Sequence, residues 1–152
     1  MRIISSIEEA IAAVGSDFGV SDWVTVDQDR IDAFADATGD HQWIHVDVER
    51  ARTESPYRST IAHGFLTLSL IPALSKANYR VDNAKMGINY GLNRVRFLAP
   101  VPAGSRVRVR SALIDAVKVD DATVDLTVRH TVELDGSVKP AAVAELIART
   151  VF

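Results

Sequence analysis

The N-terminal part of the chain alternates between helical and strand-like spacing of apolar residues. Ser6 and Glu9 have the spacing of a capping box, and apolar residues recur every three to four positions until Gly15. This pattern predicts a short amphipathic helix. Residues 20–26 are predicted to form a strand. Asp27 then precedes residues 28–37, whose spacing predicts a second helix capped by that aspartate.

The middle of the chain has one segment that is apolar almost all round. Residues 61–75 show this pattern, which predicts a buried helix, and Pro72 lies inside it. Residues 46–52 are expected to form one or two helical turns before it. The polar stretches 54–60 and 77–85 on either side are expected to be loops.

The C-terminal half alternates apolar and polar residues, which is typical of strands with one solvated face. The segments with this pattern are 86–97, 106–110, 123–134 and 141–151, and Asp135-Gly136 is a hairpin turn signal. The whole pattern predicts an α+β fold in which one buried helix packs against a mainly antiparallel sheet of about five strands. The exposed edge of so small a sheet needs a cover.

Composition narrows the functional classes. The 152 residues are expected to form one domain over 1–152, with 47% hydrophobic and 24% charged residues as in globular proteins. A net charge of −3 gives no electrostatic basis for binding nucleic acid or an anionic membrane. The absence of cysteine, of a signal-peptide pattern at the N-terminus and of an apolar run of about 20 residues predicts a cytoplasmic protein.

Candidate chemistry is concentrated just after the second predicted helix. Asp40 and His45 would point about 140° apart on a continuous helix. Gly39, however, indicates that the helix has ended, and in a tight turn the two side chains can meet. A carboxylate and an imidazole that meet can hold and activate a water molecule. The residues alone fit equally well with a structural role of Asp40 in a turn.

The same stretch carries a family resemblance. Gly39-Asp40-His41-Gln42-Trp43-Ile44-His45 is similar to the Gly-Asp-x-Asn-Pro-x-His motif of the hydratase 2 enzymes among the MaoC-like hydratases. Ala62-His63-Gly64 and the segment 96–101 also resemble that family, and the similarity extends from about Trp23 to Phe152. Gln42 and Trp43 replace the Asn-Pro pair, and this variant looks most like the nodulation-protein-N-like branch.

The resemblance implies a hotdog fold, in which the sheet wraps a long central helix over 61–75 and two copies pair as a homodimer. It implies an (R)-specific trans-2-enoyl-CoA hydratase that also works in reverse as a (3R)-hydroxyacyl-CoA dehydratase. Asp40 and His45 would share the reacting water, and the Gly64 N–H would bind the thioester oxygen. No metal or redox cofactor is implied, because coenzyme A is part of the substrate.

Several alternatives stay open at this point. Within enzymes they are a dehydratase acting on acyl carrier protein and a hotdog thioesterase, and outside enzymes a non-catalytic acyl-binding protein. A metal site formed by Asp40, His41, His45 and Asp47 is a further hypothesis, since such ligands suit zinc or iron.

Most of the histidines and arginines outside the motif are expected to have structural roles. His63 is expected to fix the turn into the buried helix, and His130 is expected to be a hydrogen-bonded core histidine. Arg94 and Arg96 are candidates for binding the phosphates of coenzyme A. The row of arginines at 106, 108 and 110 is expected to be a solvated strand face.

Overall fold

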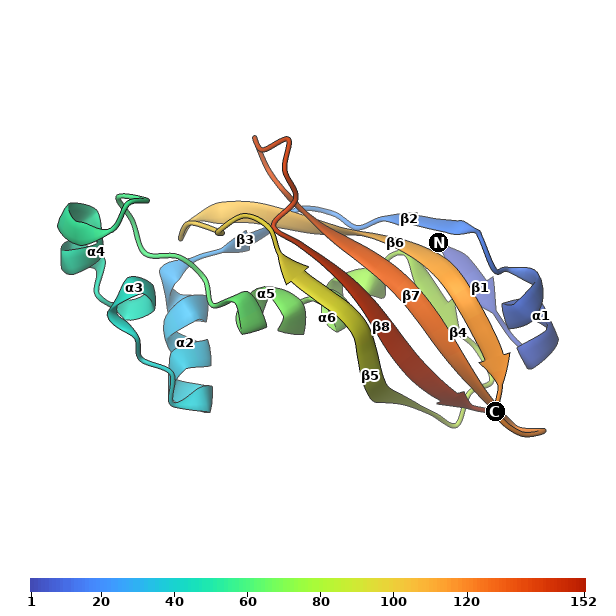
Figure 1. Ribbon diagram of the computed structural model, residues 1–152. Coiled ribbons are helices and arrows are strands. Elements are labelled where there is room, and N and C mark those ends of the chain that lie inside the picture. The colour runs from blue at the N-terminus through green and yellow to red at the C-terminus, as the bar shows by residue number, and fades with distance from the viewer.

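The computed structural model describes residues 1–152. It contains six helices: α1 (Ile7–Ala12), α2 (Gln28–Thr38), α3 (Trp43–Val46), α4 (Val48–Glu54), α5 (Gly64–Ser69) and α6 (Ile71–Ser75). It contains eight strands: β1 (Arg2–Ile4), β2 (Asp17–Val20), β3 (Val24–Val26), β4 (Tyr79–Val81), β5 (Met86–Phe97), β6 (Ser105–Lys118), β7 (Thr123–Leu134) and β8 (Ala142–Val151). Helices α5 and α6 lie along the large sheet, while α2, α3 and α4 gather at one end of the molecule (Figure 1).

The large sheet is antiparallel and has the strand order β2-β6-β7-β8-β5, with β3 also paired to β6. This confirms the predicted α+β architecture with the hotdog arrangement of a sheet around a central helix. The alternation of apolar and polar residues works as expected, because every second side chain of β6 and β7 enters the core. The turn at Gly136, where φ is 74°, joins β7 to the segment leading into β8.

The prediction of one continuous strand over residues 20–26 is wrong, because β2 ends at Val20 and β3 begins at Val24. Ser21 is buried, and its N–H donates to the Val109 carbonyl over 3.0 Å. Its hydroxyl oxygen accepts from the Val109 N–H over 3.0 Å. The side chain thereby takes the place of a backbone acceptor and ends the regular ladder, so that β2 and β3 pair separately with β6. The sheet consequently has six strands where about five were predicted.

The prediction of a loop over residues 77–85 is also wrong in part, because the segment contains the strand β4. Within it, β4 pairs in parallel with β1 at the N-terminus, from Arg2 opposite Tyr79 to Ile4 opposite Val81. Three residues are too few to show a strand pattern in the sequence. The side chains of Tyr79 and Val81 pack against a buried cluster that includes Ile4 and Phe18, which stabilises this small second sheet.

The central helix is buried as predicted but is shorter and divided. Residues 61–63 are extended, and α5 begins only at Gly64. Leu70 joins α5 to α6, and its N–H donates to Leu66 while its carbonyl accepts from Leu74, both over 3.1 Å. Pro72 has no N–H to donate and is accommodated in the first turn of α6. A core that includes Ile31, Leu66, Ile71 and Val109 fixes this helix pair against the sheet.

Both predicted helix caps are present. The Ser6 hydroxyl oxygen accepts from the Glu9 N–H at the start of α1, and the Asp27 carboxylate accepts from the Arg30 N–H at the start of α2. Strand β5 forms an outer edge of the large sheet and is exposed over most of its length. None of the helices has both the length and the apolar character needed to cross a bilayer.

Candidate active site

The candidate site begins where α2 ends. Gly39 adopts the left-handed conformation with φ of 80°, and its N–H donates to the Ala35 carbonyl over 2.8 Å. A residue with a side chain would be strained at this φ, so the glycine allows the sharp turn. Asp40 follows in the turn, and His45 lies in the short helix α3. The two residues are therefore not on one helix, as expected from Gly39.

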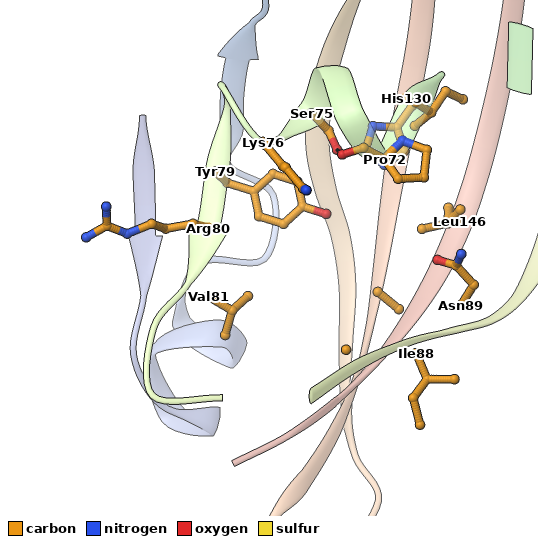
Figure 2. A pocket seen from close by; sticks show the side chains of 13 residues that line it. Pro72, Ser75, Lys76, Tyr79, Arg80, Val81, Ile88, Asn89, His130 and Leu146 are labelled. Carbon is orange, nitrogen blue, oxygen red and sulfur yellow. Dashed lines mark hydrogen bonds between the residues drawn. The ribbon is translucent and has the colours of Figure 1, made fainter. Parts of the chain in front are cut away.

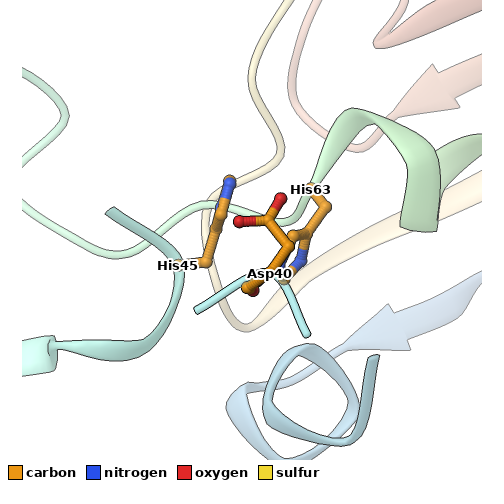
Figure 3. A group of neighbouring side chains, drawn as sticks. All are labelled: Asp40, His45 and His63. Atoms are coloured by element: carbon orange, nitrogen blue, oxygen red, sulfur yellow. The ribbon is translucent and has the colours of Figure 1, made fainter. Parts of the chain in front are cut away.

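The turn brings one carboxylate and two imidazole side chains together. A carboxylate oxygen of Asp40 and one ring nitrogen each of His45 and His63 lie within 4.8 Å of one another. The Asp40 side chain lies beside both imidazole rings (Figure 3). The two histidines are buried, whereas Asp40 is exposed. The cluster can therefore be reached from solvent on the carboxylate side.

One ring nitrogen of His45 is hydrogen-bonded to the backbone. Nδ1 lies 2.7 Å from the carbonyl oxygen of Ile61, so this nitrogen carries the proton and donates it to the carbonyl. Nε2 is left with its lone pair. Burial is the main cause that lowers the pKa of His45, and the neighbouring His63 lowers it further, against the opposing effects of the Ile61 carbonyl and Asp40. His45 is therefore a neutral hydrogen-bond acceptor at neutral pH.

His63 connects the turn to α5. Its Nε2–H donates to the backbone carbonyl of Asp40 over 2.9 Å, and its ring stacks on His45 with centroids 3.8 Å apart. Nδ1 of His63 is buried and has no hydrogen-bond partner. The expected role of His63 in fixing the turn agrees with this bond. The stacking on His45 was not predicted from the sequence, because the two histidines lie on different segments.

Gly64 lies at the first residue of α5, where backbone N–H groups lack acceptors within the helix. Gly64 and His45 both line a cavity of about 380 Å³, whose wall is mostly apolar and includes Tyr57, Thr67 and Phe97. A Cβ at Gly64 would lie 3.0 Å from the Phe97 ring. The absence of a side chain therefore keeps Phe97 close to the helix start and leaves the cavity open beside the histidine.

The four-ligand metal hypothesis does not fit the structure. His41 is exposed and its Nε2 lies 2.9 Å from the carboxylate of Asp36. Asp47 caps α4, where its carboxylate accepts from the Arg50 N–H. Neither residue joins the cluster around Asp40, because each is held by a local bond of its own.

Other residues considered from the sequence have structural partners. His130 is fully buried and hydrogen-bonded to Ser111, as predicted. The three arginines of β6 form ion pairs with Asp135, Glu133 and Asp17 on a solvated face, also as predicted. Arg96 donates to the backbone carbonyl of Val95, and it lies with Arg94 on the edge strand β5, outside the cavity beside His45.

The chain is similar to known proteins over most of its length. The family described as MaoC like domain matches residues 9–134. The chain is 55% identical to 3-hydroxyacyl-thioester dehydratase Z of Mycobacterium tuberculosis over 99% of both chains. It is 47% identical to nodulation protein N of Rhizobium leguminosarum, over 93% of this chain and 89% of that protein.

Two solved structures share the fold. A monoamine oxidase regulatory protein from Archaeoglobus fulgius superposes with a TM-score of 0.82 at 24% identity, covering 99% of this chain and 96% of the other. An (R)-hydratase from A. caviae involved in PHA biosynthesis gives a TM-score of 0.70 at 22% identity, covering 89% and 94%. The family match and the close relatives show that the chain belongs to the MaoC-like dehydratases, in the branch that contains nodulation protein N, and is an enzyme of the hydro-lyase class.

Proposed function

We propose that this protein is an (R)-specific trans-2-enoyl-CoA hydratase that also dehydrates (3R)-hydroxyacyl-CoA. The observation that carries the proposal is the cluster of Asp40 and His45 beside a largely apolar cavity that begins at Gly64. A relative of 55% identity is named as a 3-hydroxyacyl-thioester dehydratase, and a structural neighbour is named as an (R)-hydratase, which supports the same reaction here.

The proposed reaction uses one water molecule held between Asp40 and His45. One water that makes two hydrogen bonds of ordinary length spans about 4.6 Å. A carboxylate oxygen of Asp40 lies within 4.8 Å of one ring nitrogen of His45, which leaves room for such a water beside the pair. Both groups are acceptors, because Nε2 of His45 has a lone pair and Asp40 offers a carboxylate. The water therefore donates both hydrogens to the pair and presents its oxygen lone pairs to the substrate.

Hydration then proceeds by attack of this oxygen on the β-carbon of the enoyl thioester. The pair takes up a proton from the water and returns it to the α-carbon, so that water is added across the double bond with no net change in the pair. Negative charge develops on the thioester oxygen during this step. The Gly64 N–H is the proposed donor to that oxygen, and loss of one such donor typically costs about 3 kcal/mol in the barrier.

The reaction as proposed requires neither a metal nor a redox cofactor, and coenzyme A enters as part of the substrate. The use of acyl-CoA thioesters and the absence of cysteines are consistent with a cytoplasmic location. Arg94 and Arg96 stay candidates for contacting the coenzyme A phosphates from the edge strand.

We also propose that the protein works as a homodimer. Strand β5 has a neighbour on one side only, and the apolar side chains of Ile88, Tyr90 and Leu92 on it are roughly half exposed. A long, exposed, apolar edge strand is prone to pair with another chain. A second copy of β5 would satisfy the open backbone groups and cover these side chains.

The test is turnover on a small set of thioesters. Crotonyl-CoA and an eight-carbon enoyl-CoA are incubated with the protein while the absorbance of the conjugated double bond and the release of free thiol are followed. The proposal predicts loss of the absorbance without thiol release and a (3R) product. Thiol release would instead indicate a thioesterase. If neither CoA thioester is turned over, the same assay is run on enoyl-acyl carrier protein. Activity only on that compound would assign it as the substrate, and no turnover on the CoA thioesters or on the carrier protein would indicate a non-catalytic acyl-binding protein.

A further inference from the structure

A second cavity lies at the far end of the central helix pair from the candidate active site. It has a volume of about 310 Å³ and is lined by residues of α6, β4, β5, β7 and β8. Figure 2 shows the His130 ring beside Pro72 and Ser75 of α6, with Tyr79, Asn89 and Leu146 around the same space. No acidic residue is among those that line it.

A smaller cavity adjoins the distal cavity on the side of α5. It is lined by Leu68 and Ser69 of α5 and shares Pro72, Asn89 and Leu146 with the distal cavity. The active-site cavity is lined by Gly64 and Thr67 of α5. The three cavities thus follow one another along α5 and α6, over about 16 Å of helix from Gly64 to Ser75.

The protonation pattern of His130 can be deduced from its partners. Asn78 Nδ2 donates to the Ser111 hydroxyl oxygen over 2.9 Å, and that oxygen lies 3.0 Å from Nδ1 of His130. The single hydrogen of the hydroxyl has no other acceptor, so it is donated to Nδ1. The neutral ring then carries its own proton on Nε2. Burial lowers the pKa of His130 to about 4, which keeps the ring neutral at pH 7.

This Nε2–H is left without an acceptor. The ring of His130 is fully buried, and Nε2 has no hydrogen-bond partner in the protein. His130 is among the residues that line the distal cavity, whereas Ser111, which occupies Nδ1, is not. Nε2 has almost no accessible surface, so an acceptor reaches it only when the side chains around it move. A buried donor without a partner is costly, and an acceptor bound beside it would remove that cost.

We propose that the distal cavity binds the end of an acyl chain that carries an oxygen, which accepts a hydrogen bond from Nε2–H of His130. This proposal rests on the function proposed above and names its substrate class as thioesters with an oxygenated tail. Tyr79 also lines the cavity, and its hydroxyl points into the same space as the Lys76 amine (Figure 2). Burial raises the pKa of Tyr79 to about 12, so its hydroxyl keeps its hydrogen and adds a second donor.

The test compares enoyl-CoA substrates of matched chain length that end in a methyl, a hydroxyl or a carboxylate group, over a series of increasing lengths. We expect kcat/KM at one length to be about tenfold higher for an oxygenated tail than for the methyl-ended chain, the effect of one added hydrogen bond. A preference for the hydroxyl would indicate His130 and Tyr79 as the donors, whereas a preference for the carboxylate would add Lys76.

The variant His130→Phe should reduce this preference to about one. Arg129→Gln is the matched control, because Arg129 is the exposed neighbour of His130 on β7, pairs with Glu145 and does not line the cavity, so it should keep the wild-type preference. If His130→Phe does not fold, the Nε2–H resonance of His130 is followed by NMR in the wild-type protein. A saturated acyl-CoA with a terminal hydroxyl should shift it, and the alkyl analogue should not.

Turnover of all three tails with equal kcat/KM at every length would overturn this inference and leave the proposed function standing. A resonance shift with the alkyl analogue as large as with the hydroxyl compound would also overturn it, because an ordered water would then be the partner of Nε2. Absence of turnover on every thioester would overturn both proposals.

Discussion

The two buried histidines of the candidate site differ in which nitrogen is free. In His45, Nδ1 is bound to the Ile61 carbonyl, whereas in His63 it is Nε2 that is bound, to the Asp40 carbonyl. Only His45 lines the active-site cavity. In the proposed reaction, the lone pair on Nε2 of His45 accepts a proton from the water.

The protonation of His45 should be visible in the pH dependence of activity. The pKa of His45 is lowered from its ordinary value of 6.5 by burial, so the ring is neutral at pH 7 and becomes charged only at a lower pH. Protonation removes the lone pair that holds the water. We expect kcat/KM to be constant near pH 7 and to fall on acidification with a midpoint below 6.5. A midpoint clearly above 6.5 would contradict the neutral assignment.

Gly64 should tolerate no side chain. In Gly64→Ala the new Cβ would lie 3.0 Å from the Phe97 ring, which would have to move within the cavity. We expect kcat/KM for crotonyl-CoA to fall by about ten- to a hundredfold because the substrate is displaced. The double variant Gly64→Ala with Phe97→Leu, measured in parallel, should recover part of this loss. No recovery would mean that the contact with Phe97 is not the cause.

For single residues of the candidate site, the sequence indicates which residues are candidates but not how their side chains are oriented. Asp40 and His45 could be singled out by local signals, a helix-ending glycine and a short spacing. Their expected catalytic roles, and that of Gly64, depended on the resemblance to the hydratase 2 motif. The ring orientation of His45 depends on Ile61, which is 16 residues away, and the stacking on His63 depends on where α5 begins. Such contacts between distant segments leave no spacing pattern that can be recognised.

Among the elements, β5 carries the proposed dimer contact. Leu92→Lys places a charge on the exposed apolar edge, where desolvating it in a dimer would be unfavourable. We expect a shift from dimer to monomer in sedimentation at low micromolar concentration. The control is Val138→Lys, at a fully exposed residue outside the strands, which should stay dimeric. A Leu92→Lys protein of unchanged mass would show that β5 is not the interface.

Helices and strands whose apolar and polar residues follow a regular spacing over their whole length could be predicted. Short strands and segments interrupted by a side-chain or bridge contact could not. Strand β5 spans the predicted residues 86–97, and both helix caps act as expected. The division of 20–26 depends on a side chain, Ser21, that substitutes for backbone, and β4 exists only because β1 pairs with it. The central helix starts later than predicted because Ile61 is held in an isolated bridge to Pro102, although its apolar residues continue the helical pattern.

For the whole molecule, His130 links stability to pH. The unfolded chain binds a proton at His130 near pH 6.5, whereas the folded protein does so only near pH 4. Folding stability is therefore full above pH 6.5 and is lost as pH falls towards 4, by about 3 kcal/mol from this residue. Urea unfolding at several pH values measures this loss. In His130→Gln the loss over the same range should be smaller, and an equal loss would contradict the assignment.

The central claim is that Asp40 and His45 together activate the water. The most direct measurement is kcat on crotonyl-CoA for Asp40→Asn and His45→Gln, with folding checked by circular dichroism and with His41→Gln as control. His41 is a neighbouring exposed histidine that pairs with Asp36 outside the cluster. We predict a loss of at least about a hundredfold in each of the two site variants and an unchanged rate in the control. A folded Asp40→Asn protein with wild-type turnover would contradict the account.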